Sequence, residues 1–186
     1  MTENTRPWLA VGLLALLPVL AACAAAEPDT VSQPPGDDAP PPPAASVELP
    51  CGAADAAELE AIFGSGFGDG RAGSANVTEN DVTWTPDSCT WQADGIEMQL
   101  RVAEAADFEG GFVCLEPIAV GRDLEPVSGV GDQAWWEFTD RSGAEGELRV
   151  CTGDTLVEVL VDAESGESAS LRDQAIEVGE LVISRL

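Results

Sequence analysis

Carboxylates are the main chemical groups that this sequence offers. Residues 47–186 contain 29 acidic residues against seven arginines, and the whole chain has no histidine, lysine or tyrosine. A serine or cysteine nucleophile therefore has no ordinary side-chain base to activate it, and no Gly-x-Ser-x-Gly motif is present. Two carboxylates can cleave a glycosidic bond, but the sequence singles out no pair among so many. We expect no enzymatic activity, with a carboxylate-based hydrolase as the alternative.

One glycine motif has the spacing of a dinucleotide-binding loop. It consists of Gly129-Val130-Gly131 followed by Ala134. Such a loop must open a helix whose amino terminus faces phosphate, whereas here Asp132 and two strand-forming tryptophans follow. We predict a turn. No twelve-residue calcium loop is present either, so we expect no cofactor and no dedicated metal site.

Cys23 ends a segment that resembles a bacterial export signal. A short head carries Arg6, and residues 8–22 are almost wholly apolar. These 15 residues would reach about 22 Å as a helix, short of the ~30 Å hydrocarbon layer, so no permanent transmembrane anchor is expected. Leu20-Ala21-Ala22-Cys23 resembles the lipobox, in which the chain is cut before a cysteine that becomes diacylated. We predict a signal peptide at 1–22 and lipid on Cys23, with a plain cleaved signal as the alternative.

The segment after Cys23 cannot form a core by itself. Residues 24–50 hold eight prolines, four of them in the run Pro40–Pro43, with hardly an aliphatic side chain between them. We predict an extended, partly polyproline tether over residues 23–49 and one folded domain over residues 50–186.

Four further cysteines lie in the predicted domain. An even count in an exported chain indicates two disulfides, and three pairings are open. We favour Cys51 with Cys89 and Cys114 with Cys151, because each bond then closes a loop of similar length around one half of the domain. On the loop-entropy argument each would stabilise the fold by about 3–4 kcal/mol. Zinc is the alternative, but no Cys-x-x-Cys spacing and no histidine support it.

The charge of the domain excludes one class of partner. A strongly negative surface repels phosphate, so nucleic acid is not expected as a partner and adsorption to anionic lipid is disfavoured. Solubility is the simpler explanation of this charge, and a functional cation-binding surface is the alternative.

Two adjacent tryptophans, Trp135 and Trp136, are the candidate ligand contacts. Neighbours on a strand point to opposite faces, so only one of them can enter a one-sided core. The other either packs under a loop or helix or contacts a ligand, because an exposed tryptophan is a typical binding anchor.

The first half of the domain contains a helix and a hairpin. Residues 53–63 are rich in Ala, Glu and Leu and end at Gly64, which predicts a helix of about three turns. Residues 64–80 are rich in glycine and predict an exposed loop. Strand-forming residues at 82–91 and 96–102 flank Asp94-Gly95, a strong signal for a tight turn.

The second half adds strands and a final helix. Residues 104–116 predict a short helix, and residues 118–127 a loop or a short edge strand. Residues 134–138 and 148–152 predict strands, and the apolar run at 155–161 predicts a central strand. Residues 168–186 predict a helix with a wide apolar face. The expected fold class is therefore α+β: an antiparallel sheet of about five strands with helices packed on one face, stapled by disulfides.

Several of these motifs together resemble a known family. They are Pro50-Cys51-Gly52, Cys89-Thr90-Trp91, the segment Gly129-Val130-Gly131-Asp132-Gln133-Ala134-Trp135, and the amphipathic last helix. In this combination the chain resembles small actinobacterial cell-envelope lipoproteins of the domain of unknown function 3558 type. The resemblance spans most of residues 50–186 and implies an envelope lipoprotein with no established enzymatic activity. Cys114 and Cys151 are not part of the family pattern.

The expected function is that of a non-catalytic binding or accessory module of the cell envelope. The chain would lie at the cell membrane, on its extracytoplasmic face, and be held there by lipid on Cys23. Its partner would be an envelope protein or an apolar ligand that contacts Trp135 or Trp136 and the glycine-rich loop at residues 64–80. The alternative is a carboxylate-based hydrolase or a cation-binding protein of the cell wall.

Overall fold

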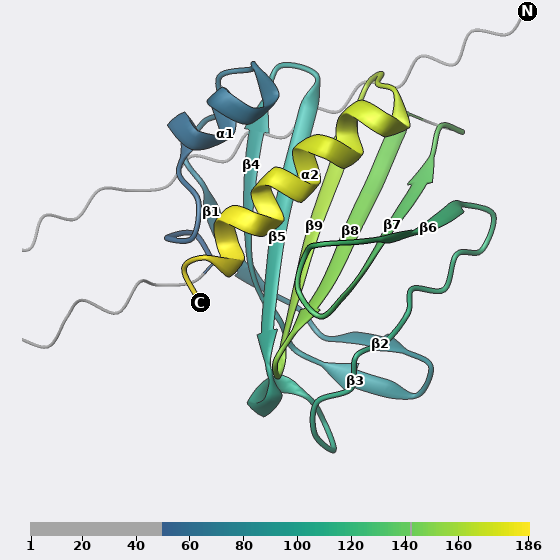
Figure 1. Cartoon of the computed structure of the whole chain (residues 1–186). Coiled ribbons are helices and arrows are strands. Elements are labelled where there is room, and N and C mark those ends of the chain that lie inside the picture. Colours follow the sequence, from purple (N-terminus) through teal and green to yellow (C-terminus); the bar gives the residue numbers. More distant parts are fainter. Residues whose placement is uncertain (1–49, 142) are drawn as a thin grey trace, which may run out of the picture. The chain divides into compact units, whose positions relative to one another are not determined.

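The computed structural model describes residues 50–141 and 143–186, and Figure 1 shows how their elements are arranged. The predicted signal peptide (1–22), the predicted tether (23–49) and Cys23 lie outside the described residues. The described part of the chain is mainly antiparallel sheet with two α-helices and two disulfides.

The main sheet has seven strands in the order β1-β4-β5-β9-β8-β7-β6, and every neighbouring pair is antiparallel. A separate two-stranded sheet pairs β2 with β3. The strands are β1 (Arg71–Ser74), β2 (Val77–Glu79), β3 (Val82–Trp84), β4 (Asp87–Ala93), β5 (Ile96–Glu104), β6 (Asp123–Val127), β7 (Gln133–Thr139), β8 (Ala144–Thr152) and β9 (Thr155–Ala163).

Two tight hairpins form the middle of the main sheet. Asp94-Gly95 joins β4 to β5, and Gly153-Asp154 joins β8 to β9. Both glycines have positive φ, +71° at Gly95 and +57° at Gly153, which suits two-residue hairpin turns. The hairpins meet where β5 pairs with β9. The predicted turn at Asp94-Gly95 and the central position predicted for residues 155–161 are thus confirmed.

Helix α2 (Ser168–Ile183) lies across one face of the sheet (Figure 1). It buries Leu171, Ala175, Val178 and Val182, which follow one another at helical spacing. Gly179 lets the helix approach the sheet closely, because a Cβ there would lie 3.0 Å from Leu148 Cδ2.

Helix α1 (Ala56–Phe63) has clear signals at both ends. The Asp55 carboxylate accepts a hydrogen bond from the Glu58 backbone N–H, and the Glu58 carboxylate accepts one from Asp55 N–H, which is a capping box. Gly64, at φ +73°, ends the helix. Arg185, just after α2, donates to the Glu58 carboxylate and to the Ala53 carbonyl, and so ties α1 to the end of α2.

The main core lies between α2 and the sheet. Alternate residues of β5, β8 and β9 point toward the helix and are buried there. Trp136 joins them, at 1% exposure, and donates from its indole N–H to Ser168 Oγ. Gly146 has no side chain because the Trp136 ring packs directly over it. The central strands contribute Met98, Leu100, Val102, Leu148, Val150, Val157, Val159 and Val161.

A second, smaller core lies at the other face of the sheet, near the β2–β3 hairpin. It buries Trp84, Phe108 and Leu156, and the Trp84 and Phe108 rings are stacked with centroids 5.7 Å apart. The disulfide between Cys114 and Cys151 reaches the same cluster, and its sulfurs are 2.04 Å apart.

A second disulfide joins Cys51 to Cys89, so both bonds have the pairing that was favoured from the sequence. Cys51 lies just before α1, and Cys89 is a buried residue of β4. This bond therefore holds the first helix against the sheet.

The predicted count of about five strands was wrong, because the main sheet has seven and a second sheet has two. The four residues of β1 are all exposed and show no apolar alternation, so residues 64–80 resembled a loop. The short helix predicted over residues 104–116 is only the 3₁₀ turn η1 (Ala105–Asp107). Gly110 and Gly111 follow it with φ of +94° and +99°, which a helix does not accommodate. Residues 123–127 form the edge strand β6, one of the two outcomes predicted there.

Candidate functional site

The face of the sheet that is turned away from α2, here called the outer face, carries polar side chains in register. Alternation along β5, β9 and β8 turns every second residue to this face. Antiparallel pairing then places these residues side by side in three transverse rows. The acidic row is Glu97, Asp162 and Glu145, the middle row is Gln99, Leu160 and Glu147, and the arginine row is Arg101, Glu158 and Arg149.

Arg149 is the centre of a buried ion-pair cluster. Only 5% of the residue is exposed, and its guanidinium lies 2.9 Å from Glu79, 3.1 Å from Glu147 and 3.0 Å from Glu158. The same guanidinium lies 5.9 Å from the centre of the Trp84 ring. Since Glu79 belongs to β2 and Trp84 to β3, the cluster fixes the small hairpin to the outer face.

Glu158 is the most deeply buried carboxylate of this cluster, at 1% exposure. Burial raises the pKa of Glu158 to about 7; the negative charge of Glu147 adds to this rise, and Arg149 opposes it. Its Oε2 atom lies 3.8 Å from Arg101 Nη1 and has no hydrogen-bond partner among the described residues. A carboxyl group in this setting is partly protonated near neutral pH.

A second ion pair closes the far side of the outer face. Arg122, just before β6, lies 2.8 Å from Glu137 and 3.1 Å from Glu145. Glu137 is only 5% exposed, and this burial raises its pKa, while the hydrogen bond from Arg122 opposes the rise. Arg122 is therefore already held by two carboxylates of the sheet.

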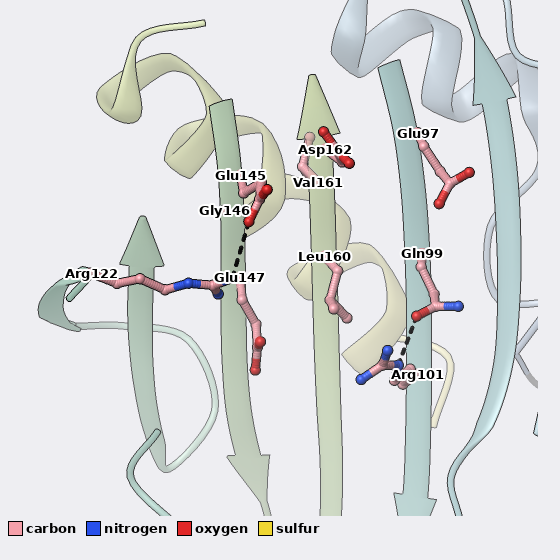
Figure 2. A pocket seen from close by; sticks show the side chains of 10 residues that line it. All are labelled: Glu97, Gln99, Arg101, Arg122, Glu145, Gly146, Glu147, Leu160, Val161 and Asp162. Carbon is pink, nitrogen blue, oxygen red and sulfur yellow. Dashed lines mark hydrogen bonds and ion pairs between the residues drawn. The ribbon is translucent and has the colours of Figure 1, made fainter. Parts of the chain in front are cut away.

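Between these ion pairs the outer face forms an open hollow of about 270 Å³ (Figure 2). Leu160 is one of the residues that line the hollow, and polar side chains of β5, β8 and β9 surround Leu160. Arg101 and Arg122 lie toward opposite sides of this hollow. The remaining lining residues are Glu97, Gln99, Glu145, Gly146, Glu147, Val161 and Asp162.

The acidic row places three carboxylates directly opposite one another on adjacent strands. Glu97 pairs with Asp162, and Asp162 pairs with Glu145. Glu97 accepts a hydrogen bond of 2.7 Å from Gln92, whereas exposed Asp162 has no hydrogen bond or ion pair to another described residue. Like charges directly opposite one another on neighbouring strands destabilise a sheet. This row therefore costs stability and draws positive charge to the hollow.

The two candidate tryptophans lie away from the hollow. Trp136 is a buried residue of the main core, and Trp135 is half-buried and packs against the second core. The tryptophans do point to opposite faces of β7, as the sequence predicts. Neither lines the hollow of Figure 2.

The glycine motif forms a turn, as predicted from the residues that follow it. Gly131 has φ +55°, and the next residue, Asp132, donates its N–H to the Cys151 carbonyl. The Asp132 carboxylate accepts from the Gly153 N–H at 2.8 Å. The motif thus connects two strand ends rather than opening a helix.

Comparison with known proteins gives no assignment: no protein-family model, curated protein or solved structure matches the chain. No helix in the described part of the chain is both long and apolar enough to span a bilayer. Among residues 50–141 and 143–186, no group of three or more Cys, Asp or Glu side chains is placed to hold a metal ion.

Sequence reasoning missed the outer face as a site. The alternation of Glu97, Gln99 and Arg101 with apolar residues was visible in one strand, but it indicates only a polar face. The site arises from the register of three strands, which places Asp162 and Glu145 in one row with Glu97. The pairing of β5 with β9 in that register joins residues far apart in the chain, such as Glu97 and Asp162.

Proposed function

We propose that the chain is a membrane-anchored extracytoplasmic lipoprotein whose domain is a non-catalytic binding module of the cell envelope. The predicted signal peptide and the lipobox around Cys23 support this location. The resemblance to lipoproteins of the domain of unknown function 3558 type supports it as well, and we propose membership of that group on the quoted motifs.

The observation that carries the binding role is the open hollow of the outer face. The opposite face is covered by α2 and is apolar, and the lower part of the outer face is covered by the β2–β3 hairpin. The remaining part is concave and polar, and ion pairs hold two of its lining side chains in place, those of Arg122 and Glu147. A pre-formed hollow of this kind is a better candidate contact surface than Trp135 or Trp136.

Two measurements test this proposal. The intact mass of the protein purified from membranes should match a chain that begins at diacylated Cys23, and an unacylated mass would refute the anchor. The isotope-labelled full chain in a nonionic detergent should then be titrated with solubilised envelope material. Amide shifts should cluster at the middle and acidic rows. Amide shifts that occur elsewhere and not at these two rows would refute the proposed binding surface.

A carboxylate-based hydrolase or a cation-binding protein of the cell wall is the second candidate. Its support is Glu158, whose pKa burial raises to about 7, as a general acid at neutral pH requires, with the Glu147 carboxylate beside it at Arg149. Glu158, however, is paired with Arg149 and does not line the hollow. Turnover of cell-wall glycans that disappears in Glu147→Gln would favour this candidate, and absence of turnover in the native protein would remove it.

A further inference from the structure

We propose that the hollow of the outer face binds a basic segment of a partner polypeptide, with one lysine or arginine side chain lying over Leu160 and its charged end at the acidic row. This inference rests on the proposed binding function and names the class of ligand for the same surface.

The shape of the hollow fits a side chain that is apolar along its stem and charged at its tip. Leu160, half-buried on β9, provides an apolar patch at the middle row. The next residue of β9 on the same face is Asp162, which has Glu97 and Glu145 at its sides. Lysine and arginine side chains lay their methylene stems on apolar surface and keep the charged group in a polar setting. Successive residues on the same face of a strand lie about 7 Å apart, so a stem that lies over Leu160 can bring its charged end to Asp162.

Charge complementarity selects a basic partner. Two arginines line the hollow: Arg122 is held by Glu137 and Glu145, and Arg101 lies 3.8 Å from the Glu158 carboxylate. In the acidic row Arg122 pairs with Glu145 alone, so Glu97 and Asp162 still repel each other unless a second cation enters. A positive group from a ligand would remove a repulsion that the folded chain itself leaves in place.

The same argument excludes two other occupants. Residues 24–49 of this chain contain acidic residues and no basic residue, so they would be repelled from the hollow. A second copy of the domain is strongly acidic too, with 29 acidic residues against seven arginines over residues 47–186. A partner of opposite charge is therefore required.

The test uses the full chain in a nonionic detergent and, as the probe, octalysine with blocked ends. Octalysine should shift the amides of Leu160 and the acidic row, and its affinity should fall as salt is raised. The variant Glu97→Gln/Asp162→Asn should bind about 3- to 25-fold more weakly, since an exposed ion pair contributes up to about fivefold in affinity.

A matched control removes the same charge from the opposite side of the domain. Asp173→Asn/Glu177→Gln changes two exposed acids of α2, and it should alter the affinity for octalysine less than twofold.

Because Glu97→Gln/Asp162→Asn relieves a like-charge contact, the unfolding temperature of this variant should equal or exceed that of the native chain. Equal loss in both variants would overturn the site, since binding would then follow net charge alone.

Two further probes decide whether a polypeptide is the occupant. Calcium ions or neutral chitin oligosaccharides that shift the same amides more strongly than octalysine would overturn the inference. If envelope material shifts the two rows but octalysine does not, the ligand class is wrong and the proposed binding function stands. If neither shifts them, both proposals fail.

Discussion

Replacing Glu158 with glutamine should flatten the dependence of stability on pH. Burial raises the pKa of Glu158 from the ordinary 4.5 to about 7, so the folded state binds this proton more tightly than the unfolded state. The folded state gains from the protonated group below pH 4.5 and loses that gain as the pH rises to about 7. At about 1.4 kcal/mol for each tenfold change in proton affinity, the loss is about 3 kcal/mol.

Urea unfolding with the disulfides intact, measured at intervals from pH 4.5 to 8, gives the free energy of unfolding for both proteins. The stability of the native chain should fall relative to that of Glu158→Gln by about 3 kcal/mol over this range. The difference between the two curves isolates Glu158, because other carboxylates such as Glu137 titrate in both proteins. Glu177→Gln, an exposed change on α2, should give a curve parallel to the native one. Parallel curves for Glu158→Gln as well would refute the reasoning.

Three other changes test separate parts of the fold by urea unfolding. Arg149→Met should lower the free energy of unfolding by about 3–5 kcal/mol at pH 7, because it leaves the carboxylates of the cluster without their cation. The loss should be smaller at pH 5, where Glu158 binds a proton, and an equal loss at both pH values would contradict this reasoning. Gly146→Ala should cost about 1–3 kcal/mol because its Cβ would overlap the Trp136 ring, whereas Gly66→Ala, with nothing nearby, should cost little. Replacing both Cys114 and Cys151 with alanine should cost about 4 kcal/mol, given a sequence separation of 37, and a loss below 1 kcal/mol would show that the bond constrains little.

The elements with strong local signals were predictable from the sequence. The Asp94-Gly95 hairpin, the central strand at residues 155–161 and the last helix all agree with the structure within a few residues. In each case the signal is local: a turn dipeptide, an apolar run or a helical repeat of apolar residues. The four cysteines also pair as loop length favours.

The elements that depend on distant neighbours were not predictable. Strand β1 (Arg71–Ser74) is polar and exposed, and it exists because it can pair with the edge of β4. Residues 82–91 were predicted as strand next to the Asp94-Gly95 turn, but only β4 joins that hairpin, whereas β3 pairs with β2 in a small sheet that Glu79 fixes to the main sheet through Arg149. Local residue preferences contain no information on such contacts, so residues 64–80 resembled a loop.

The contrast between two rows of the outer face bears on what this face does. In the arginine row, Glu158 lies between Arg101 and Arg149, so neighbouring charges attract, and the row fixes the small hairpin. The acidic row lies only two rows away on the same strands, and there Asp162 lies between the like charges of Glu97 and Glu145, of which only Glu145 pairs with an arginine, Arg122. A single arginine in place of Asp162 would relieve this repulsion, as the arginine row demonstrates on the same sheet. The ion pair of Glu145 and the hydrogen bond of Glu97 leave the charge of Asp162 uncompensated within the described residues, and a cationic partner that binds at this row would account for it.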